Sequence, residues 1–212
     1  MKRYLNLFGF LVSGAFIFMQ SLPVFAMDGV AVISNLEGTG QILRGGQVLP
    51  AQTGMACQKN DVLKTGGDCR LDFSMNGLAG CRILASSECA IQNADAGSMH
   101  LKVGSGNVVL NLKKLPAGAE FKVETPTAVA SVRGTQFWGR VEGAAGENPI
   151  TTFAVRDGSV IVTPKGPWKT FVLEKGQALD IPKDPAVIPV LRPALEEELN
   201  AMRQADAIQT SA

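Results

Sequence analysis

LDFSMNG, at residues 71–77, is the stretch that decides the fold most clearly. Leu71 and Phe73 alternate with polar residues, which is the period of a strand that buries one face. Asn76 and Gly77 both tolerate the positive φ angles of a type I′ turn, so this dipeptide is a strong signal for a β-hairpin. The stretch therefore predicts a strand that runs directly into a tight hairpin.

The same design recurs on both sides of this hairpin, between about residues 30 and 181. Gly45-Gly46 separates two short apolar runs, and Gly104-Ser105-Gly106 separates two more. We interpret Gly104-Ser105-Gly106 as a hairpin turn and not a phosphate-binding loop, because strands are expected on both sides of it. Many short strands joined by glycine turns predict an all-β fold of stacked short-stranded sheets, and their spacing fits a sandwich, a barrel or a solenoid-like stack.

The first 26 residues have the parts of a signal peptide. Lys2 and Arg3 precede an apolar run over residues 5–19, and Val24 and Ala26 stand at the positions that a signal peptidase reads. The apolar run is shorter than the roughly 20 residues that span a bilayer, which favours cleavage over retention as an anchor. We expect cleavage after Ala26, no stable membrane anchor afterwards, and a periplasmic or secreted protein.

Charge and length restrict the function and the domain plan. Removal of residues 1–26 takes away two cations and leaves 186 residues with 18 basic and 19 acidic side chains, a formal charge of −1. Such a near-neutral chain with scattered Lys and Arg lacks the clustered basic surface that nucleic-acid binding requires. The sequence predicts one β-domain over residues 27–182, followed by a Pro-rich linker and helix over residues 183–212.

The tail after the β-domain has a different pattern. Its prolines predict no regular structure over residues 184–192. Leu195, Leu199 and Met202 then follow at helical spacing, which predicts one short amphipathic helix over residues 193–207, opened by a proline. Because so short a helix is marginal alone, we expect it to pack on its own β-domain, and docking to a partner is the alternative.

Four cysteines, Cys57, Cys69, Cys81 and Cys89, fall in one short region of a chain addressed to an oxidising compartment, which predicts disulfide bonds. Their separations of 12, 12 and 8 residues lack the close pair that a zinc site uses, so no metal is expected. Two bridges can be drawn in three ways. The nested pairing, Cys57–Cys89 with Cys69–Cys81, is preferred because the second pair flanks the predicted hairpin.

A further segment, TPTAVASVRGTQF at residues 125–137, resembles the most recognisable stretch of FecR-type domains. The residues that carry this match are Thr125, Pro126, Arg133, Gly134, Thr135 and Phe137. Other strands and turns of the family are resembled in the same order by residues 61–66, 101–106, 155–160 and 175–179. The resemblance therefore spans roughly residues 30–182.

This resemblance implies an all-β FecR-like domain, sandwich or solenoid-like, outside the cytoplasm. The best-known members belong to membrane-spanning anti-sigma regulators that pass a signal from an outer-membrane receptor inward. No cytoplasmic sigma-binding domain is expected in this chain, because nothing precedes the predicted signal peptide. The chain looks like the stand-alone exported FecR-domain proteins, so we do not expect it to signal across the envelope alone.

Within the matching motif, we interpret Arg133 as a structural clamp and not as a ligand contact. Its guanidinium offers five donors for the carbonyls of neighbouring turns, and a buried guanidinium must be paired. Gly134 is expected to permit a turn or a close approach of strands. Thr135 is expected to bond a backbone group through its hydroxyl.

Catalytic patterns are missing from the sequence. The single histidine, His100, stands at a predicted strand boundary without an orienting partner, and no SxxK occurs after residue 26. Trp138 is expected in the core and Trp168 in an exposed turn, where it could stack on a sugar. We expect no enzyme and no cofactor.

The function that this sequence favours is a non-catalytic binding, sensing or scaffold module of the cell envelope, whose partner is an unknown envelope protein or glycan. The alternative is an unrecognised envelope hydrolase or carbohydrate-active protein. Exposed edge strands and the tail helix could each support self-association, so the oligomeric state stays open.

Overall fold

The computed structural model describes residues 31–143 and 148–208, and the predicted signal peptide lies outside them. The described residues form strands and one short C-terminal helix, which confirms the predicted all-β class. Nowhere in these two ranges is there a helix with the length and apolar character needed to cross a membrane. The elements are β1 (Ala31–Glu37), β2 (Gly40–Arg44), β3 (Gln47–Pro50), β4 (Ala56–Cys57), β5 (Val62–Thr65), β6 (Arg70–Met75), β7 (Ala79–Ile83), β8 (Glu88–Asp95), β9 (Ser98–Leu112), β10 (Glu120–Glu124), β11 (Ala128–Val132), β12 (Gln136–Glu142), β13 (Ile150–Asp157), β14 (Ser159–Pro164), β15 (Phe171–Glu174), β16 (Gln177–Pro182), β17 (Val190–Pro193) and α1 (Glu196–Gln204).

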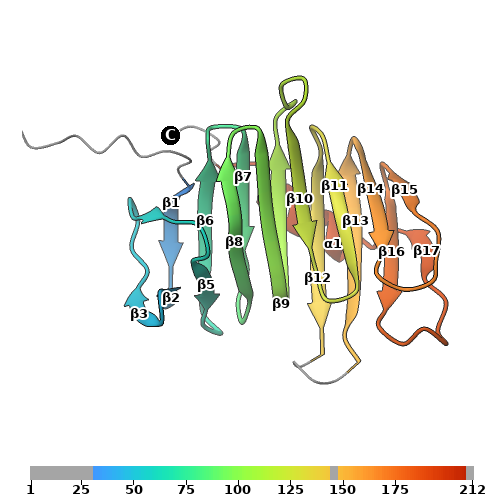
Figure 1. The fold of residues 1–212 in the computed structure, drawn as a ribbon, viewed down its shortest axis with the longest axis horizontal. Helices are drawn as coiled ribbons and strands as arrows, with labels where there is room; N and C mark the ends of the chain where they lie inside the picture. Colours follow the sequence, from blue (N-terminus) through green and yellow to red (C-terminus); the bar gives the residue numbers. More distant parts are fainter. Residues whose placement is uncertain (1–30, 144–147, 209–212) are drawn as a thin grey trace, which may run out of the picture.

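The strands form two sheets that share β9 (Figure 1). Sheet A has the order β4-β1-β6-β7-β9-β12-β13-β16-β17, and sheet B has the order β3-β2-β5-β8-β9-β10-β11-β14-β15. Neighbouring strands are antiparallel except β9 and β10, which run parallel. Hairpins of sheet A (β6–β7, β12–β13 and β16–β17) are interspersed along the chain with hairpins of sheet B (β2–β3, β8–β9, β10–β11 and β14–β15), so the chain builds both layers together as it advances along the molecule.

One hydrophobic core lies between the two sheets and extends along the whole sandwich. Strand β14 shows the expected alternation, because its buried and exposed residues follow each other strictly. The largest side chains of this core are fully buried, among them Phe73, Phe121, Phe137 and Phe153. Each such burial contributes about 1.5–3 kcal/mol relative to an exposed side chain, so the alternation of the sequence is the main source of the fold's stability.

Two of the predicted glycine turns form as expected. Asn76 and Gly77 have φ angles of 51° and 63° between β6 and β7, and the register places Met75 opposite Ala79. Gly45-Gly46 joins β2 to β3 with φ angles of 55° and 83°. Both turns have the positive φ pair that type I′ geometry requires.

Strand β6 is covered on both faces, although its alternating pattern predicts only one buried face. Leu71 and Phe73 point into the core. The residue between them, Asp72, is also buried, because it pairs with Arg82 on β7 while Arg82 donates a hydrogen bond to the carbonyl of Gln204 at the end of α1. The C-terminal tail therefore covers polar residues that the pattern assigns to solvent.

The glycines at 104 and 106 do not form the predicted hairpin. Strand β9 continues through them, pairing with β8 and β10 in sheet B and then with β7 and β12 in sheet A. Gly106 has a φ of 81°, and a Cβ there would lie 2.2 Å from Ser87 Oγ and 2.6 Å from Ser87 Cα. The glycine serves a close approach at the point where one strand passes between the layers, and not a reversal of the chain.

The tail contains a strand where prolines predict none. Strand β17 pairs with β16, with Leu191 opposite Leu179. The N–H of Ala194 donates to the Gly176 carbonyl. Backbone N–H groups along an antiparallel strand point alternately toward the partner strand and away from it, so the backbone nitrogens of Pro193 and Pro189 face the free edge. Their missing N–H groups are not needed there, which is why the prolines are compatible with a strand at the sheet's edge.

The helix is shorter than the sequence predicts. Helix α1 spans Glu196–Gln204, and Leu195 is its N-cap. Pro193 lies in β17 and not at the first helical position. The prediction of a short C-terminal helix is confirmed, and its boundaries are corrected because β17 extends sheet A up to Pro193.

Candidate functional site

The outer face of sheet A carries a second, smaller hydrophobic cluster, because α1 lies across it (Figure 1). Its members are Val109, Trp138, Ala154 and Ala178 from the neighbouring strands β9, β12, β13 and β16, and Met202, Ala205 and Ile208 from the tail. The helix thus packs on its own β-domain, as expected. Trp138 is buried as expected too, although under the helix and not between the sheets.

Polar contacts fix the beginning of α1 to the sheet. Arg192 on β17 donates hydrogen bonds to Asp180 on β16 (Nε to Oδ2, 2.7 Å) and to Glu198 on the helix (Nη2 to Oε1, 2.6 Å). Glu198 also accepts the N–H of Leu195 at 2.7 Å, which closes the first turn. The hydrogen bonds to Glu198 and Asp180 raise the pKa of Arg192. A buried carboxylate is tolerable here because it is fully paired.

A second set of contacts fixes the end of α1. Gln136 on β12 donates through Nε2 to the Met202 carbonyl at 3.1 Å and to Asp206 Oδ1 at 2.8 Å. Arg156 on β13 donates through Nη1 to Gln136 Oε1 at 2.8 Å and to Asp206 Oδ1. The bonds from Arg156 and then Gln136 lower the pKa of Asp206. Side chains of the sheet therefore satisfy carbonyls that a helix leaves open at its end.

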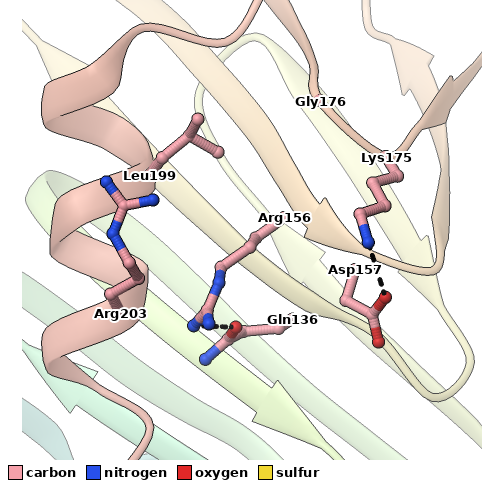
Figure 2. A pocket seen from close by; sticks show the side chains of 7 residues that line it. All are labelled: Gln136, Arg156, Asp157, Lys175, Gly176, Leu199 and Arg203. Carbon is pink, nitrogen blue, oxygen red and sulfur yellow. Dashed lines mark hydrogen bonds and ion pairs between the residues drawn. The ribbon is translucent and has the colours of Figure 1, made fainter.

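A pocket of about 420 Å³ opens between α1 and the ends of β13 and β15 (Figure 2). Its lining residues are Gln136, Arg156, Asp157, Lys175, Gly176, Leu199 and Arg203. Three of them are cationic and one is anionic, and the two arginines reach the pocket from opposite walls, one from β13 and one from α1 (Figure 2). The guanidinium and ammonium groups offer N–H donors that suit a ligand with a negative group.

The motif that carries the family resemblance forms structure around β10, β11 and β12. The Thr125 hydroxyl donates to the Ala128 carbonyl at 3.1 Å and accepts from the Thr151 hydroxyl at 2.9 Å, which fixes the turn at Pro126. Phe137 is fully buried, and its ring centroid lies 6.3 Å from that of Phe153. Phe137 and Phe153 belong to the core between the sheets, and neither these rings nor the residues of the Pro126 turn line the pocket.

Arg133 does not act as the predicted clamp. Its side chain is exposed, and within the described ranges it has no hydrogen bond or ion pair. The turn is held instead by Gly134 and Thr135. Gly134 has a φ of 73°, and the Thr135 hydroxyl donates to the Ser159 carbonyl at 2.9 Å. The turn closes through its backbone and a threonine, so the guanidinium is left to solvent.

The four cysteines are buried free thiols in this structure. Burial raises the pKa of Cys57 and of Cys89 to about 12, and it raises the pKa of Cys81 and Cys69 as well. The β6–β7 register places Cys81 opposite Phe73, about 13 Å along the strand from Cys69. That separation excludes the predicted Cys69–Cys81 bridge, because a disulfide joins Cα atoms less than about 7 Å apart. The Cys57–Cys89 bridge stays a prediction.

His100 and Trp168 lie in surroundings that differ from those expected. His100 is inside β9 and not before a strand, and its Nε2 lies 3.3 Å from Glu124 Oε2 on β10. Trp168 is half-buried, and its ring lies against Gly166. Among residues 31–143 and 148–208, no group of three or more His, Cys, Asp or Glu side chains is arranged to hold a metal ion.

None of the predicted motif residues lines the pocket, and the sequence interpretation did not single out those that do. Gln136 stands directly after Thr135 in the motif, and Arg156-Asp157 stands in a segment read only as a strand and turn. Arg203 is separated from Gln136 by 67 positions. A usable signal was the pair Arg156-Asp157 where β13 ends, because binding residues are concentrated in the loops that a rigid scaffold positions.

Comparison with known proteins finds one matching family model and one shared fold. The family model described as FecR protein matches residues 61–161. Two crystal structures of a proposed anti-sigma factor from Parabacteroides distasonis ATCC 8503 share the fold, with TM-scores of 0.54 and 0.55 and 16% sequence identity in each case. No curated protein matches the sequence.

The matched regions include only part of the candidate site. The structural matches cover 66% and 68% of this chain and 62% and 64% of the two solved chains. The matched family region ends within β14, so it contains Gln136, Arg156 and Asp157 but not Lys175 or Arg203. One wall of the pocket therefore comes from the tail that follows the matched region.

Proposed function

Because the chain carries a FecR-type domain over residues 61–161, we propose that it is a non-catalytic sensing or binding module of the cell envelope. The family match supports a regulatory role, and the solved structures that share its fold are those of a proposed anti-sigma factor. The partner of this module is an envelope protein or a glycan.

The observation that carries this proposal is the helix-covered face of sheet A. Helix α1 is fixed to the sheet at both ends and leaves a pocket whose charged walls come from the sheet and from the helix. His100, the single histidine, lies in sheet B with Glu124 and does not line this pocket. Such a face offers recognition groups in fixed positions, which is the requirement of a binding site.

The proposal includes an extracytoplasmic location. We expect residues 1–26 to be removed as a signal peptide, so that the protein of the periplasm or medium begins at Met27. In that compartment Cys57 and Cys89 are the candidates for a disulfide, since both are buried in the core between the sheets. Sequencing of the exported protein's N-terminus would test the cleavage site.

Site-specific photo-crosslinking in the native envelope tests the binding function. A photoreactive residue would replace Lys102 on the outer face of sheet B, Glu197 on the outward face of α1, or Lys175 at the pocket, one at a time. All three side chains are exposed. We expect one adduct of defined mass that forms strongly from one of these faces. Lys59, in the loop before β5, provides a matched exposed position at the other end of the sandwich.

Two results would contradict the proposed function. Equal, weak adducts from all four positions would indicate contact without recognition. Turnover of an envelope polymer by the purified protein would show an enzyme and not a binding module.

A further inference from the structure

The pocket beside α1 contains cationic groups whose hydrogen-bonding capacity is only partly used. Every recorded hydrogen bond of Arg156 within the described ranges leaves from Nη1, so Nη2 and Nε have none. Arg203 uses Nε and Nη2 for Asn200 and Glu196, which leaves Nη1. Lys175 Nζ lies 3.9 Å from Asp157 Oδ1, beyond hydrogen-bond distance. We propose that this pocket binds a small molecule through an oxyanion group, a carboxylate or a phosphate.

Arg156 is the strongest of the recognition groups because its position is fixed. Gln136 and Asp206 hold its Nη1, and its side chain is 29% exposed. A guanidinium that is already oriented and partly shielded from water binds an oxyanion with less loss of side-chain entropy than a free surface residue does. Its remaining N–H groups, on Nε and Nη2, form a fork that can donate to two oxygens of one carboxylate or phosphate.

Each cation of the pocket has an anionic neighbour, so unused N–H donors, and not an excess of positive charge, would select the ligand. Asp157 is the single acidic residue of the lining. Its side chain is 76% exposed, and that of its partner Lys175 is 75% exposed. An ion pair so exposed and so long is weak and screened by salt, so a ligand can displace it. Asp206 and Glu196 each accept from an arginine of the pocket, but neither is part of the lining.

The size of the pocket restricts the ligand. A volume of about 420 Å³ lies at the lower end of the range for small-molecule sites, about 300–1,000 Å³. Leu199 supplies an apolar side chain, and Gly176 leaves open space where a Cβ would lie. These features fit a compact organic anion with a short apolar part, and they do not fit a polymer that needs an extended groove.

Binding would also couple the sheet to the helix. Arg156 belongs to β13 and Arg203 to α1, so an oxyanion between them joins the two elements. A ligand that binds only when α1 is docked stabilises the docked state. This inference rests on the proposed function for its biological purpose. Its experiment measures a ligand and not a partner, so either proposal can fail while the other stands.

Thermal unfolding and calorimetric titration of the full chain test the proposal with two probes, inorganic phosphate and succinate. At matched ionic strength, we expect at least one of them to raise the melting temperature by about 3 °C or more above the value in sodium chloride. The probe that acts identifies the oxyanion as phosphate or carboxylate. Lys175→Gln is expected to weaken binding at least about threefold, and Arg156→Gln and Arg203→Gln about tenfold.

Lys169→Gln is the matched control, since it removes an exposed lysine that lies outside the pocket. It should leave the dissociation constant unchanged. Lys175→Gln protects the test against a folding artefact, because Lys175 pairs with Asp157 at the end of β13 and not with α1. The proposal is wrong if neither anion stabilises the protein beyond sodium chloride, or if the Lys175, Arg156 and Arg203 variants bind as tightly as Lys169→Gln.

Discussion

Gly106 is the residue at which β9 leaves sheet B and enters sheet A. Its φ of 81° is costly for any residue with a Cβ, and the space for that atom is already filled by Ser87. We predict that Gly106→Ala lowers the free energy of unfolding by roughly 2–4 kcal/mol, as measured by urea denaturation. Backbone strain and a clash with the side chain and Cα of Ser87 act together there.

Gly97 provides the control for this prediction. It lies in the turn between β8 and β9, and a Cβ added there would meet nothing within 4 Å. Gly97→Ala should therefore change the unfolding free energy by less than about 1 kcal/mol. If both alanine variants unfolded at the same urea concentration, β9 would not cross between the sheets in the way described.

At the level of single elements, β17 is an edge strand whose prolines limit pairing. Val187, Ile188, Val190 and Leu191 are exposed and apolar, a combination that favours association through a sheet edge. Pro189 and Pro193 face that edge, where they offer no N–H group. This edge therefore has apolar side chains but few backbone N–H donors for pairing with another strand.

Replacement of both prolines by threonine should remove this protection. We predict that the Pro189→Thr, Pro193→Thr double variant self-associates at lower concentration than the unchanged chain, as size-exclusion chromatography with light scattering would show. Pro167→Thr, in the turn before β15, is the control and should leave the apparent mass unchanged. An unaltered mass for the double variant would mean that the prolines do not limit pairing at this edge.

Helix α1 depends in part on the ionised Asp206. The pKa of Asp206 is lowered by Arg156 and then by Gln136, so its stabilising contribution is complete above the ordinary value of about 3.9 and is lost as the pH falls through the lowered pKa of the folded state. In a Trp168→Phe background, we predict that Trp138 fluorescence shifts to the red below about pH 4. Trp138 reports this step because it is buried under the helix.

Asp206→Asn separates this carboxylate from the others that hold α1. Glu198 and Asp180 also accept hydrogen bonds at the helix, and this variant leaves them in place. The acid shift of Trp138 should be smaller in Asp206→Asn than in the parent. An identical acid transition in the two proteins would assign the effect to other carboxylates.

For the molecule as a whole, local patterns predicted the class and most turns. Alternation in β14 and the Asn76-Gly77 dipeptide each determine their structure through neighbours in sequence. The sequence pattern predicts a hairpin at Gly106 because a positive φ suits both a hairpin turn and a strand that passes from one sheet to the other. Which of the two forms depends on the contact with Ser87, a residue 19 positions earlier in the chain. The prolines around β17 were misassigned because their tolerance depends on which strand edge they face.

The candidate site was not predictable in the same way. Gln136, Arg156 and Arg203 meet only because β12 and β13 are neighbours in sheet A and α1 returns across them. The motif residues that attracted attention in the sequence serve turns and the core instead. Recognisable motifs here identify the fold, while the charged pocket arises from tertiary contacts between segments with no shared pattern.

The docking of α1 on sheet A is the claim on which the candidate site, its pocket and the proposed function depend. Hydrogen–deuterium exchange of the full chain tests it most directly, because a helix of nine residues is marginal in isolation and its amides would exchange freely if it were undocked. We predict that the amides of residues 199–204 are protected to a degree comparable with those of β12. Exchange of α1 at the rate of an unfolded peptide, while β9 and β12 stay protected, would contradict the account.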